Sequence, residues 1–238
     1  MTENKVIIAL DLSDLEKMRK AVEELSPHTG FFKVGLEMFV LFGPDIVKEV
    51  VEKKGRVMLD LKLHDIPNTV KKATKNAAFL GAELLTIHTS GGAEMMKAAR
   101  EAVDEYEHET GKKGPKLLGV TVLTSIDQGT LNEELGVDKQ VDEQVVSLAK
   151  LAQISGMNGV VSSPKEIEKV REACGEDFLI VTPGIRPAWA SKDEQKRICT
   201  PADAVKLGAN YLVIGRPVLK AENPVAAIAK INEEISNR

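Results

Sequence analysis

The feature that most constrains the fold is a regular alternation of short apolar runs with longer amphipathic stretches. The runs are rich in Val, Ile, Leu and Phe and have strand length, whereas the stretches between them have helix length. Such alternation is typical of parallel strands covered by helices. Because eight runs can be counted, the sequence predicts an α/β fold, a closed (β/α)8 TIM barrel. The predicted strands are Val6–Leu10, Phe31–Gly35, Val57–Lys62, Leu84–Thr89, Leu117–Thr124, Gly159–Ser163, Phe178–Pro183 and Tyr211–Arg216.

Helix-boundary signals fall between these runs. Three pairs have the spacing of capping boxes, namely Ser13 with Glu16, Ser163 with Glu166, and Thr200 with Asp203. Asn223 followed by Pro224 predicts the start of the last helix. Glycines that could end a helix or turn the chain precede five of the strands, at Gly30, Gly55, Gly81, Gly175 and Gly208.

The length of 238 residues allows one barrel or two small domains. No linker, low-complexity tract or block of charge divides the chain, so we expect one domain over residues 1–238. Two longer stretches without a predicted element, from Ser125 to about Gln140 and from Gly184 to about Lys196, have the length of binding loops or lids.

Composition excludes several classes of partner and location. The formal net charge of −4 disfavours a surface for nucleic acid or for an anionic membrane. The two cysteines have no metal-ligand spacing and fit a reducing compartment. The apolar run near the amino terminus stops at Asp11, too short for a signal peptide, and no run has membrane-spanning length. We therefore expect a soluble cytoplasmic protein.

The sharpest chemical signal lies in the third strand, in the segment VMLDLKLHD. Side chains alternate along a strand, so Asp60 and Lys62 share one face while Leu59 and Leu61 share the other. This places the two charged groups inside the barrel near its top and the two leucines against the helices. A buried structural ion pair is the alternative, but its desolvation cost favours an active site at the carboxyl end of the strand.

Polar residues also follow other strands, and their convergence outlines a pocket. Asp65 precedes Pro67, so it could equally cap the following helix. His88 could be a hydrogen-bonded core histidine. The remaining polar residues at predicted strand ends are Asp11, Lys33, Thr124 and Arg216.

A phosphate group fits the end of the barrel formed by the last two strands. Arg186 lies in PGIRP after the seventh strand, and Gly215 with Arg216 follows the eighth, a frequent phosphate position in this architecture. Gly215 would let a backbone N–H approach an anion, and guanidinium groups are planar permanent donors. Surface ion pairs are the alternative role for both arginines.

At these residues the sequence resembles the orotidine 5′-phosphate decarboxylase family, in its bacterial branch. DLKLHD from Asp60 to Asp65 carries the resemblance, continued by IPNT to Thr69, and TPGIRP, Gln195 and IGRP from Ile214 extend it. The resemblance implies decarboxylation of orotidine 5′-phosphate to UMP in pyrimidine biosynthesis, without metal or other cofactor. It also implies a homodimer whose active sites are shared between subunits.

The resemblance further implies a role for each matching residue. Lys62 is the expected proton donor to C6 of the pyrimidine, Asp60 is its charged neighbour, and Asp65 completes the array from the partner subunit. Contacts to substrate are expected from two groups of residues. Those at the ribose and the pyrimidine are Asp11, Lys33, Thr69, Thr124 and Ser125, of which Thr69, like Asp65, would act in the partner's site. Those at the phosphate are Arg186, Gln195, Gly215 and Arg216, with Pro183 shaping the floor of the pocket.

Two other functions remain open from the sequence. Sugar-phosphate decarboxylases and aldolases of the same wider group carry a similar array but use Mg²⁺. Their second strand supplies an acidic metal ligand, whereas this chain has Lys33 there, a cation that would oppose a divalent ion. A non-catalytic barrel that binds a phosphate-bearing ligand is the second alternative, although it would not need charges at Asp60 and Lys62.

Overall fold

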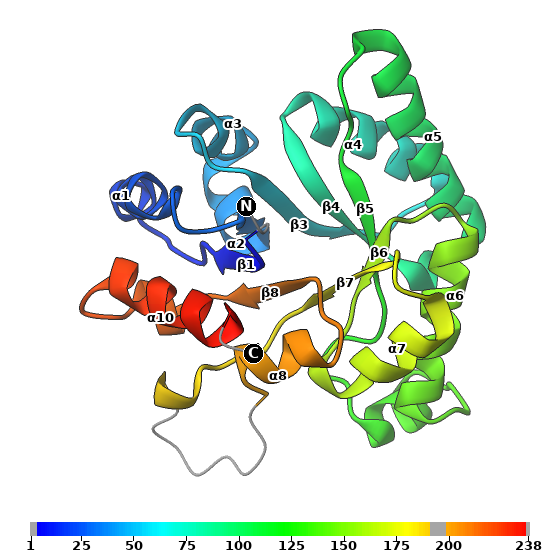
Figure 1. The fold of residues 1–238 in the computed structure, drawn as a ribbon. Helices are drawn as coiled ribbons and strands as arrows, with labels where there is room; N and C mark the ends of the chain where they lie inside the picture. Colours follow the sequence, from blue (N-terminus) through cyan, green and yellow to red (C-terminus); the bar gives the residue numbers. More distant parts are fainter. Residues whose placement is uncertain (1–3, 191–198, 237–238) are drawn as a thin grey trace.

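The computed structural model describes residues 4–190 and 199–236. Within those residues, eight parallel strands close into a barrel in chain order, with the last strand paired to the first (Figure 1). The structure thus confirms the predicted (β/α)8 TIM barrel. The strands are β1 (Val6–Ala9), β2 (Phe31–Gly35), β3 (Val57–Leu63), β4 (Ala82–His88), β5 (Lys116–Val120), β6 (Gly159–Val161), β7 (Leu179–Thr182) and β8 (Tyr211–Ile214).

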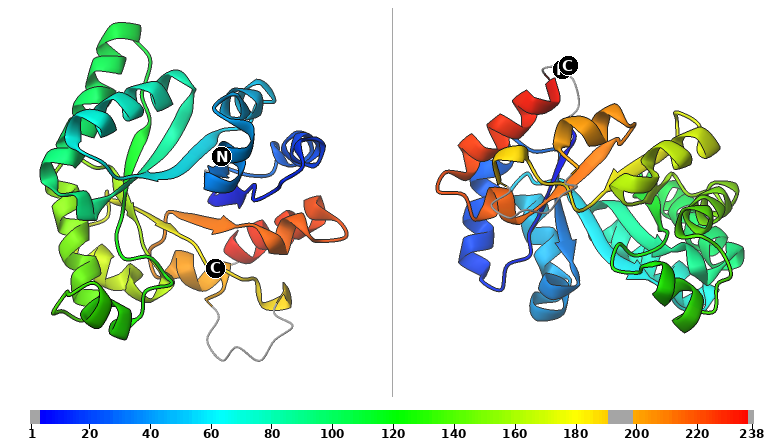
Figure 2. Two further views of the ribbon diagram at one scale, coloured as in Figure 1. Left: turned by 180° about the vertical axis from the view of Figure 1, so that it is seen from behind. Right: turned by 90° about the horizontal axis from the view of Figure 1, so that it is seen from below.

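Helices surround these strands on the outside, as the views in Figure 2 show. The α-helices are α1 (Leu15–Leu25), α2 (Leu36–Phe42), α3 (Asp45–Glu52), α4 (Pro67–Phe79), α5 (Ala93–Thr110), α6 (Val141–Ile154), α7 (Ile167–Cys174), α8 (Pro201–Lys206), α9 (Arg216–Leu219) and α10 (Pro224–Ser236). Short 3-10 turns are η1 (Thr89–Gly91), η3 (Pro164–Glu166) and η4 (Ala188–Ala190), and η2 (Thr130–Glu134) is π-helical. In the part of the chain so described, no helix has both the length and the apolar character that crossing a membrane requires.

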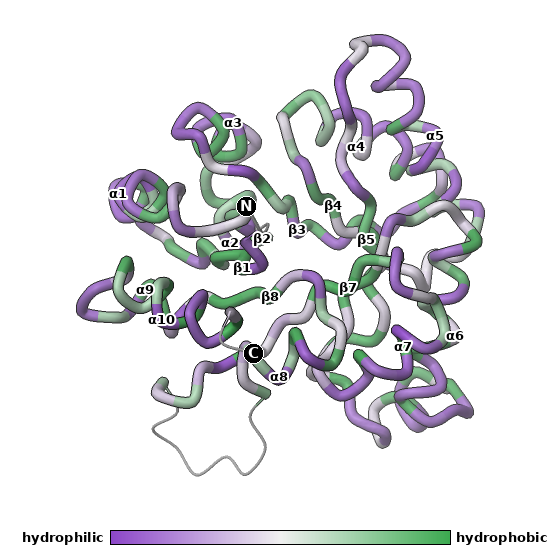
Figure 3. The backbone as a smooth tube through the Cα atoms, in the orientation of Figure 1, coloured by the Kyte–Doolittle hydropathy of each residue, from purple (hydrophilic) through white to green (hydrophobic). Residues whose placement is uncertain are grey.

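Alternation along the strands separates two apolar cores. The inner core fills the barrel, and the outer core lies between the strands and the helices; Figure 3 shows the apolar strands and the more polar outer helices. On β2, for example, Phe31 belongs to the inner core, and Phe32 and Val34 belong to the outer one. The inner core contains Ile7, Phe31, Met58, Leu84, Leu118, Val181 and Tyr211.

Aromatic and charged side chains occupy the amino-terminal end of the barrel. The rings of Phe31 and Tyr211 meet edge to face with centroids 5.4 Å apart, and the Arg56 guanidinium lies 4.0 Å from the centroid of Phe31. Arg56 also pairs with Glu83 at 3.0 Å. The charged residues Lys33 and Lys62 lie toward the opposite, carboxyl ends of β2 and β3.

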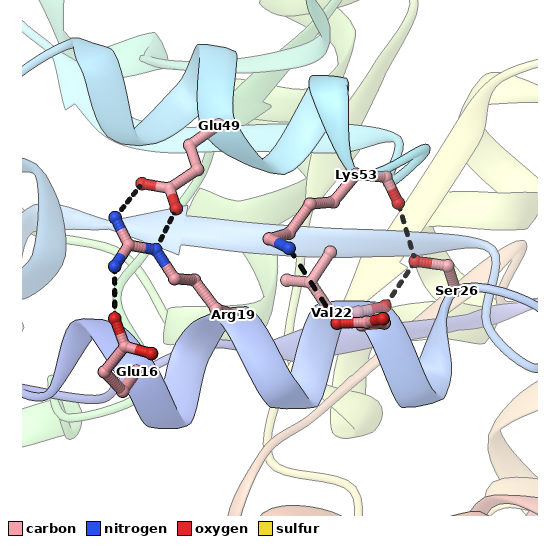
Figure 4. Close-up of polar contacts among 7 residues, drawn as sticks. Glu16, Arg19, Val22, Ser26, Glu49 and Lys53 are labelled. Carbon is pink, nitrogen blue, oxygen red and sulfur yellow. Dashed lines mark hydrogen bonds and ion pairs between the residues drawn. The ribbon is translucent and has the colours of Figure 1, made fainter.

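Polar contacts fix α1 against α3, on the side of the barrel that carries β1 to β3 (Figure 4). The Arg19 guanidinium contacts the carboxylates of Glu16 on its own helix and of Glu49 on α3. At the carboxyl ends of the two helices, the Ser26 hydroxyl donates to the carbonyl of Lys53 at 3.4 Å. These contacts hold together the two helices that precede β2 and β3, the strands that carry Lys33, Asp60 and Lys62.

Most predicted strands match within a few residues, but β5 is shorter than expected. It ends at Val120 rather than Thr124. The Thr121 hydroxyl donates to the carbonyl of Val161 at 2.9 Å, and the Thr121 N–H approaches the same carbonyl at only 3.4 Å, so the pairing with β6 ends there. Beyond this point the predicted open loop contains the π-helical turn η2.

The capping predictions hold at some helices and fail at α1. Thr200 and Asn223 accept backbone N–H groups at the starts of α8 and α10 as expected. Ser163 likewise accepts from the Lys165 N–H, but it caps the 3-10 turn η3 that precedes α7. At α1 the N-cap is Asp14, which accepts from the Lys17 N–H at 3.1 Å. The Ser13 hydroxyl instead donates to Glu37, because that carboxylate on α2 lies within 2.8 Å.

The glycines before the strands act in two different ways. Gly208 has φ +112°, a conformation that disfavours side chains and turns the chain into β8. At Gly30 the constraint is space, since an added Cβ would lie 2.2 Å from the carbonyl oxygen of Asn4. Only the first of these two cases follows the helix-ending role that the sequence suggested.

Candidate active site

Four charged side chains of alternating sign form a chain of contacts at the carboxyl ends of β1, β2 and β3. Lys33 Nζ lies 2.9 Å from Asp11 Oδ1 and 3.8 Å from Asp60 Oδ2. Lys62 Nζ donates to the same Asp60 oxygen at 2.9 Å. The structure therefore brings together four of the residues that the sequence singled out.

The middle of this chain of charges is shielded from water. The side chains of Asp60 and Lys33 are only 12% and 13% exposed, that of Lys62 is 30% exposed, and that of Asp11 is 52% exposed. Burying ionised groups is unfavourable unless opposite charges and hydrogen bonds compensate. Each cation here contacts a carboxylate, and the two positive and two negative charges balance.

The backbone of β3 departs from regular pairing where these charges occur. Its register against β4 shifts between Leu59 and Leu63, and Lys62 has φ +51°. Leu59 and Leu61 pack into the outer core as expected. Strict alternation does not predict the direction of the Lys62 side chain, because the register shift and the positive φ change the backbone at this residue.

A cavity of about 210 Å³ adjoins Asp60 and Lys62. One side carries the charged groups, and most of the remaining lining is apolar. Its lining residues are Lys33, Met58, Asp60, Lys62, Val120, Val122, Leu123, Thr124, Val161, Ser162, Ser163, Pro183 and Val213. Charges beside a largely apolar lining interact more strongly than charges in bulk water, because the effective dielectric constant is lower.

Ser162 is a polar residue of this cavity that the sequence analysis passed over. Its side chain is buried, and its hydroxyl has no hydrogen-bond partner among the described residues. The strand pattern predicts Ser162 only as part of the sixth strand, Gly159–Ser163. Its one sequence signal was a hydroxyl directly after the apolar run GVV, at the carboxyl end of that strand. The unpaired hydroxyl is available to bind a polar ligand atom.

A larger hollow of about 1090 Å³ continues outward from the cavity. It shares Thr124, Ser163 and Pro183 with the smaller cavity and adds Arg186. Ser125 is exposed but lines neither space. Pro183 lines both spaces and so lies between the charged residues of the cavity and Arg186.

The two arginines of the expected phosphate site have no carboxylate partner within the described part of the chain. Arg186 is half-buried after β7, and Arg216 is exposed at the start of α9. Gly215 lies close to β1, since an added Cβ would be 3.3 Å from Ala9. The alternative role of these arginines, in surface ion pairs, is therefore not observed within residues 4–190 and 199–236. Gln195 lies outside the described residues.

Asp65 and Thr69 are not brought to the Asp60–Lys62 pair of the same chain. Residues 64–69 are all exposed, and Asp65 Oδ1 accepts from the N–H of Ile66 at 2.6 Å. In the described residues, neither Asp65 nor Thr69 has a hydrogen bond or ion pair with Asp60 or Lys62. The helix-capping alternative for Asp65 is not observed either, because the N-cap of α4 is Ile66.

His88 lies at the end of β4, with its ring centroid 5.3 Å from that of His64. Burial, and then the neighbouring His64 and Lys62, lower the pKa of His88 below its usual value, while Asp60 acts in the opposite direction. These surroundings favour the neutral form of the imidazole over the charged one. No three His, Cys, Asp or Glu side chains within the described ranges converge to form a metal site.

The barrel and the charged cavity at the carboxyl ends of its strands define a (β/α)8-barrel enzyme. Residues 4–231 match the family described as "Orotidine 5'-phosphate decarboxylase / HUMPS family". The chain belongs to this family, as the resemblance at Asp60 to Asp65 indicated.

Relatives support the decarboxylase branch of this description. Proteins named orotidine 5'-phosphate decarboxylase from Trichlorobacter lovleyi and Moorella thermoacetica are 53% and 49% identical to this chain. The matches cover 98% of this chain, and 95% and 92% of those proteins. The crystal structure of orotidine 5'-phosphate decarboxylase from Lactobacillus acidophilus has a TM-score of 0.86 and 42% identity, and the match covers 98% of this chain and 99% of that one.

Proposed function

We propose that this enzyme decarboxylates orotidine 5′-phosphate to UMP, with Lys62 as the proton donor. The observation that carries the proposal is the Lys62 ammonium, held 2.9 Å from Asp60 at a largely apolar cavity. The names of the relatives and the family description support the substrate.

The reaction explains why fixed charges are needed at this place. When the C6–carboxylate bond breaks, CO2 leaves and its bonding electron pair stays at C6, in the plane of the ring. The π system of the ring cannot delocalise that pair, so a nearby cation must stabilise it. Lys62 does so in a site with little water, then transfers a proton to C6 and recovers one from solvent. The proposed reaction therefore requires no cofactor as an electron sink.

Asp60 has two roles in this proposal. Its carboxylate orients the Lys62 ammonium through the 2.9 Å contact, and its negative charge faces the carboxylate of the bound substrate. Repulsion between the two carboxylates diminishes as CO2 forms, which lowers the barrier. Lys33 limits this repulsion, because its ammonium is 3.8 Å from the same Asp60 oxygen.

The rest of the nucleotide extends from the cavity toward β7 and β8. Asp11 and Lys33 would contact the ribose, and Thr124 with Ser125 would face the pyrimidine above Pro183. The phosphate would be held by Arg186, Gln195, Gly215 and Arg216. Within residues 4–190 and 199–236 neither arginine has a carboxylate partner, which supports this assignment. Binding energy from the phosphate can then contribute to the chemical step.

We further propose a homodimer in which Asp65 and Thr69 act in the partner's active site. The exposed position of residues 64–69 supports this arrangement, since their side chains are free to reach another subunit. Large exposed apolar side chains on α2 and beside this segment fit such an interface. They are Leu36, Val40, Leu41 and Ile66.

Mixing two inactive variants tests the shared site. Asp65→Ala and Lys62→Ala chains should each lose turnover, and subunit exchange should restore activity in heterodimers that contain one intact site. Exchange demonstrated with tagged chains but without recovery of turnover would contradict sharing.

We place this enzyme, as one domain over residues 1–238, in the cytoplasm, where pyrimidine nucleotides are made.

The Mg²⁺-dependent sugar-phosphate enzymes are the second candidate, and Lys33 disfavours them. Its ammonium lies between Asp11 and Asp60, where it would repel a divalent cation. A binding barrel without chemistry is disfavoured by the buried charges, which a binding role alone would not require. The ultraviolet absorbance change on adding orotidine 5′-phosphate in EDTA separates the three. Rapid conversion supports the proposal, and UMP binding without conversion supports the binding barrel. Conversion of sugar phosphates only with Mg²⁺ supports the second candidate.

A further inference from the structure

Thr86 occupies a central position behind the charged residues, although no role has been assigned to it above. It lies on β4 next to β3, and its side chain is completely buried. Its hydroxyl accepts a hydrogen bond from the backbone N–H of Lys62 at 2.9 Å. The same hydroxyl donates to Asp60 Oδ1 at 2.9 Å. One side chain thus connects the two residues at the centre of the proposed chemistry.

The first of these bonds stabilises an unfavourable backbone. Lys62 has φ +51°, a conformation that side-chain-bearing residues rarely adopt. The register between β3 and β4 shifts at this point, so the Lys62 N–H is not part of the regular ladder. A buried N–H without a partner is strongly disfavoured. The Thr86 hydroxyl supplies that partner and so helps to hold the bulge that presents Lys62.

The second bond sets the orientation of the Asp60 carboxylate. Oδ1 receives the Thr86 hydroxyl, and Oδ2 receives Lys62 Nζ at 2.9 Å with Lys33 Nζ at 3.8 Å. If Oδ1 had no partner, the carboxylate could rotate and lower its contact with Lys62. Thr86 therefore fixes both ends of the pair, the backbone of the lysine and the plane of the carboxylate.

We propose that Thr86 is a positioning residue for the decarboxylation, acting through Lys62 and Asp60 without touching the substrate. The proposal rests on the function proposed above. A hydroxyl suits this place because it accepts and donates at once. Valine has nearly the same shape but can neither accept nor donate. Comparing threonine with valine at position 86 therefore separates the effect of hydrogen bonding from that of packing.

The test compares Thr86→Val with Thr86→Ser. In Thr86→Val we expect kcat for orotidine 5′-phosphate to fall by about 10- to 100-fold, as for a catalytic group displaced by a fraction of an ångström. KM should change little, because the phosphate and ribose contacts remain. Thr86→Ser keeps the hydroxyl and should recover most of kcat.

The matched control is Thr74→Val on α4. Thr74 is also fully buried, and its hydroxyl has no partner among the described residues. Its replacement should leave kcat and KM unchanged. If Thr86→Val does not fold, Thr86→Ala replaces it, since it lacks the hydroxyl and differs from Thr86→Ser by that group alone. The same loss of kcat is expected there.

Two kinetic results would overturn the proposal. One is a folded Thr86→Val enzyme whose kcat equals that of the wild type. The other is equal loss in Thr86→Ser and Thr86→Val, which would assign the effect to shape. If the wild-type chain itself does not convert orotidine 5′-phosphate, the proposed function fails, and a crystal structure of Thr86→Val still decides the positioning role. Lys62 should then leave its positive φ or its 2.9 Å contact with Asp60, and an unchanged geometry would refute it.

Discussion

Replacement of Lys33 by methionine tests whether burial makes the charges of the site depend on one another. Lys33 is 13% exposed, and its Nζ lies 3.8 Å from Asp60 Oδ2. At an effective dielectric constant of about 20, unit charges at this distance interact by about 4 kcal/mol. Lys33→Met also removes the desolvation penalty of the ammonium, which offsets part of this loss. The cluster would be left with one excess negative charge, so we expect the free energy of unfolding to fall by about 2 kcal/mol.

Urea unfolding of the ligand-free protein at pH 7, followed by circular dichroism, measures this change. Lys48→Met is the matched control, because Lys48 Nζ contacts Asp45 Oδ1 at 2.9 Å but the two side chains are 54% and 83% exposed. Its loss should be less than about 0.5 kcal/mol. Equal losses in the two variants, or a gain of stability in Lys33→Met, would refute the argument from burial.

Three further outcomes are expected. Arg216→Ala should raise KM and lower kcat/KM in steady-state assays, because a phosphate donor is lost; unchanged values would remove Arg216 from the phosphate site. Ser162→Ala should weaken UMP binding by about tenfold in calorimetry, since its hydroxyl has no partner among the described residues and is available to the ligand; unchanged affinity would argue against that contact. In NMR titrations the imidazole of His88 should protonate below the usual pKa of 6.5, mainly because it is partly buried. Protonation then disfavours the folded state, so stability should decline as the pH falls below 6.5, and a His88 pKa at or above 6.5 would contradict this.

The fold was largely predictable because strand and helix periodicity differ along the whole chain. Apolar runs located all eight strands, and alternation placed Asp60 on the inner face of β3. The end of β5 was missed, since the competition of the Thr121 hydroxyl for the Val161 carbonyl depends on a contact between distant residues. Local signals alone do not contain such contacts.

The candidate site was predictable in its charges but not in its supporting geometry. Asp60 and Lys62 were conspicuous as charged residues in an apolar run, and Lys33 and Asp11 as polar strand ends. The bulge at Lys62 and its bonds to Thr86 were not, because a threonine in a strand is common and its partner lies 24 residues away. The predicted roles of Asp65 and Thr69 depend on a second subunit, so one chain does not test them.

The central claim is that the Lys62 ammonium carries the chemistry, and turnover by Lys62→Ala tests it most directly. The ultraviolet assay with orotidine 5′-phosphate gives kcat, and calorimetry with UMP shows whether the site still binds nucleotide. We expect turnover to be nearly abolished while UMP affinity is largely retained, since the phosphate and ribose contacts remain. Turnover close to that of the wild type would contradict the account and remove Lys62 from the catalytic role.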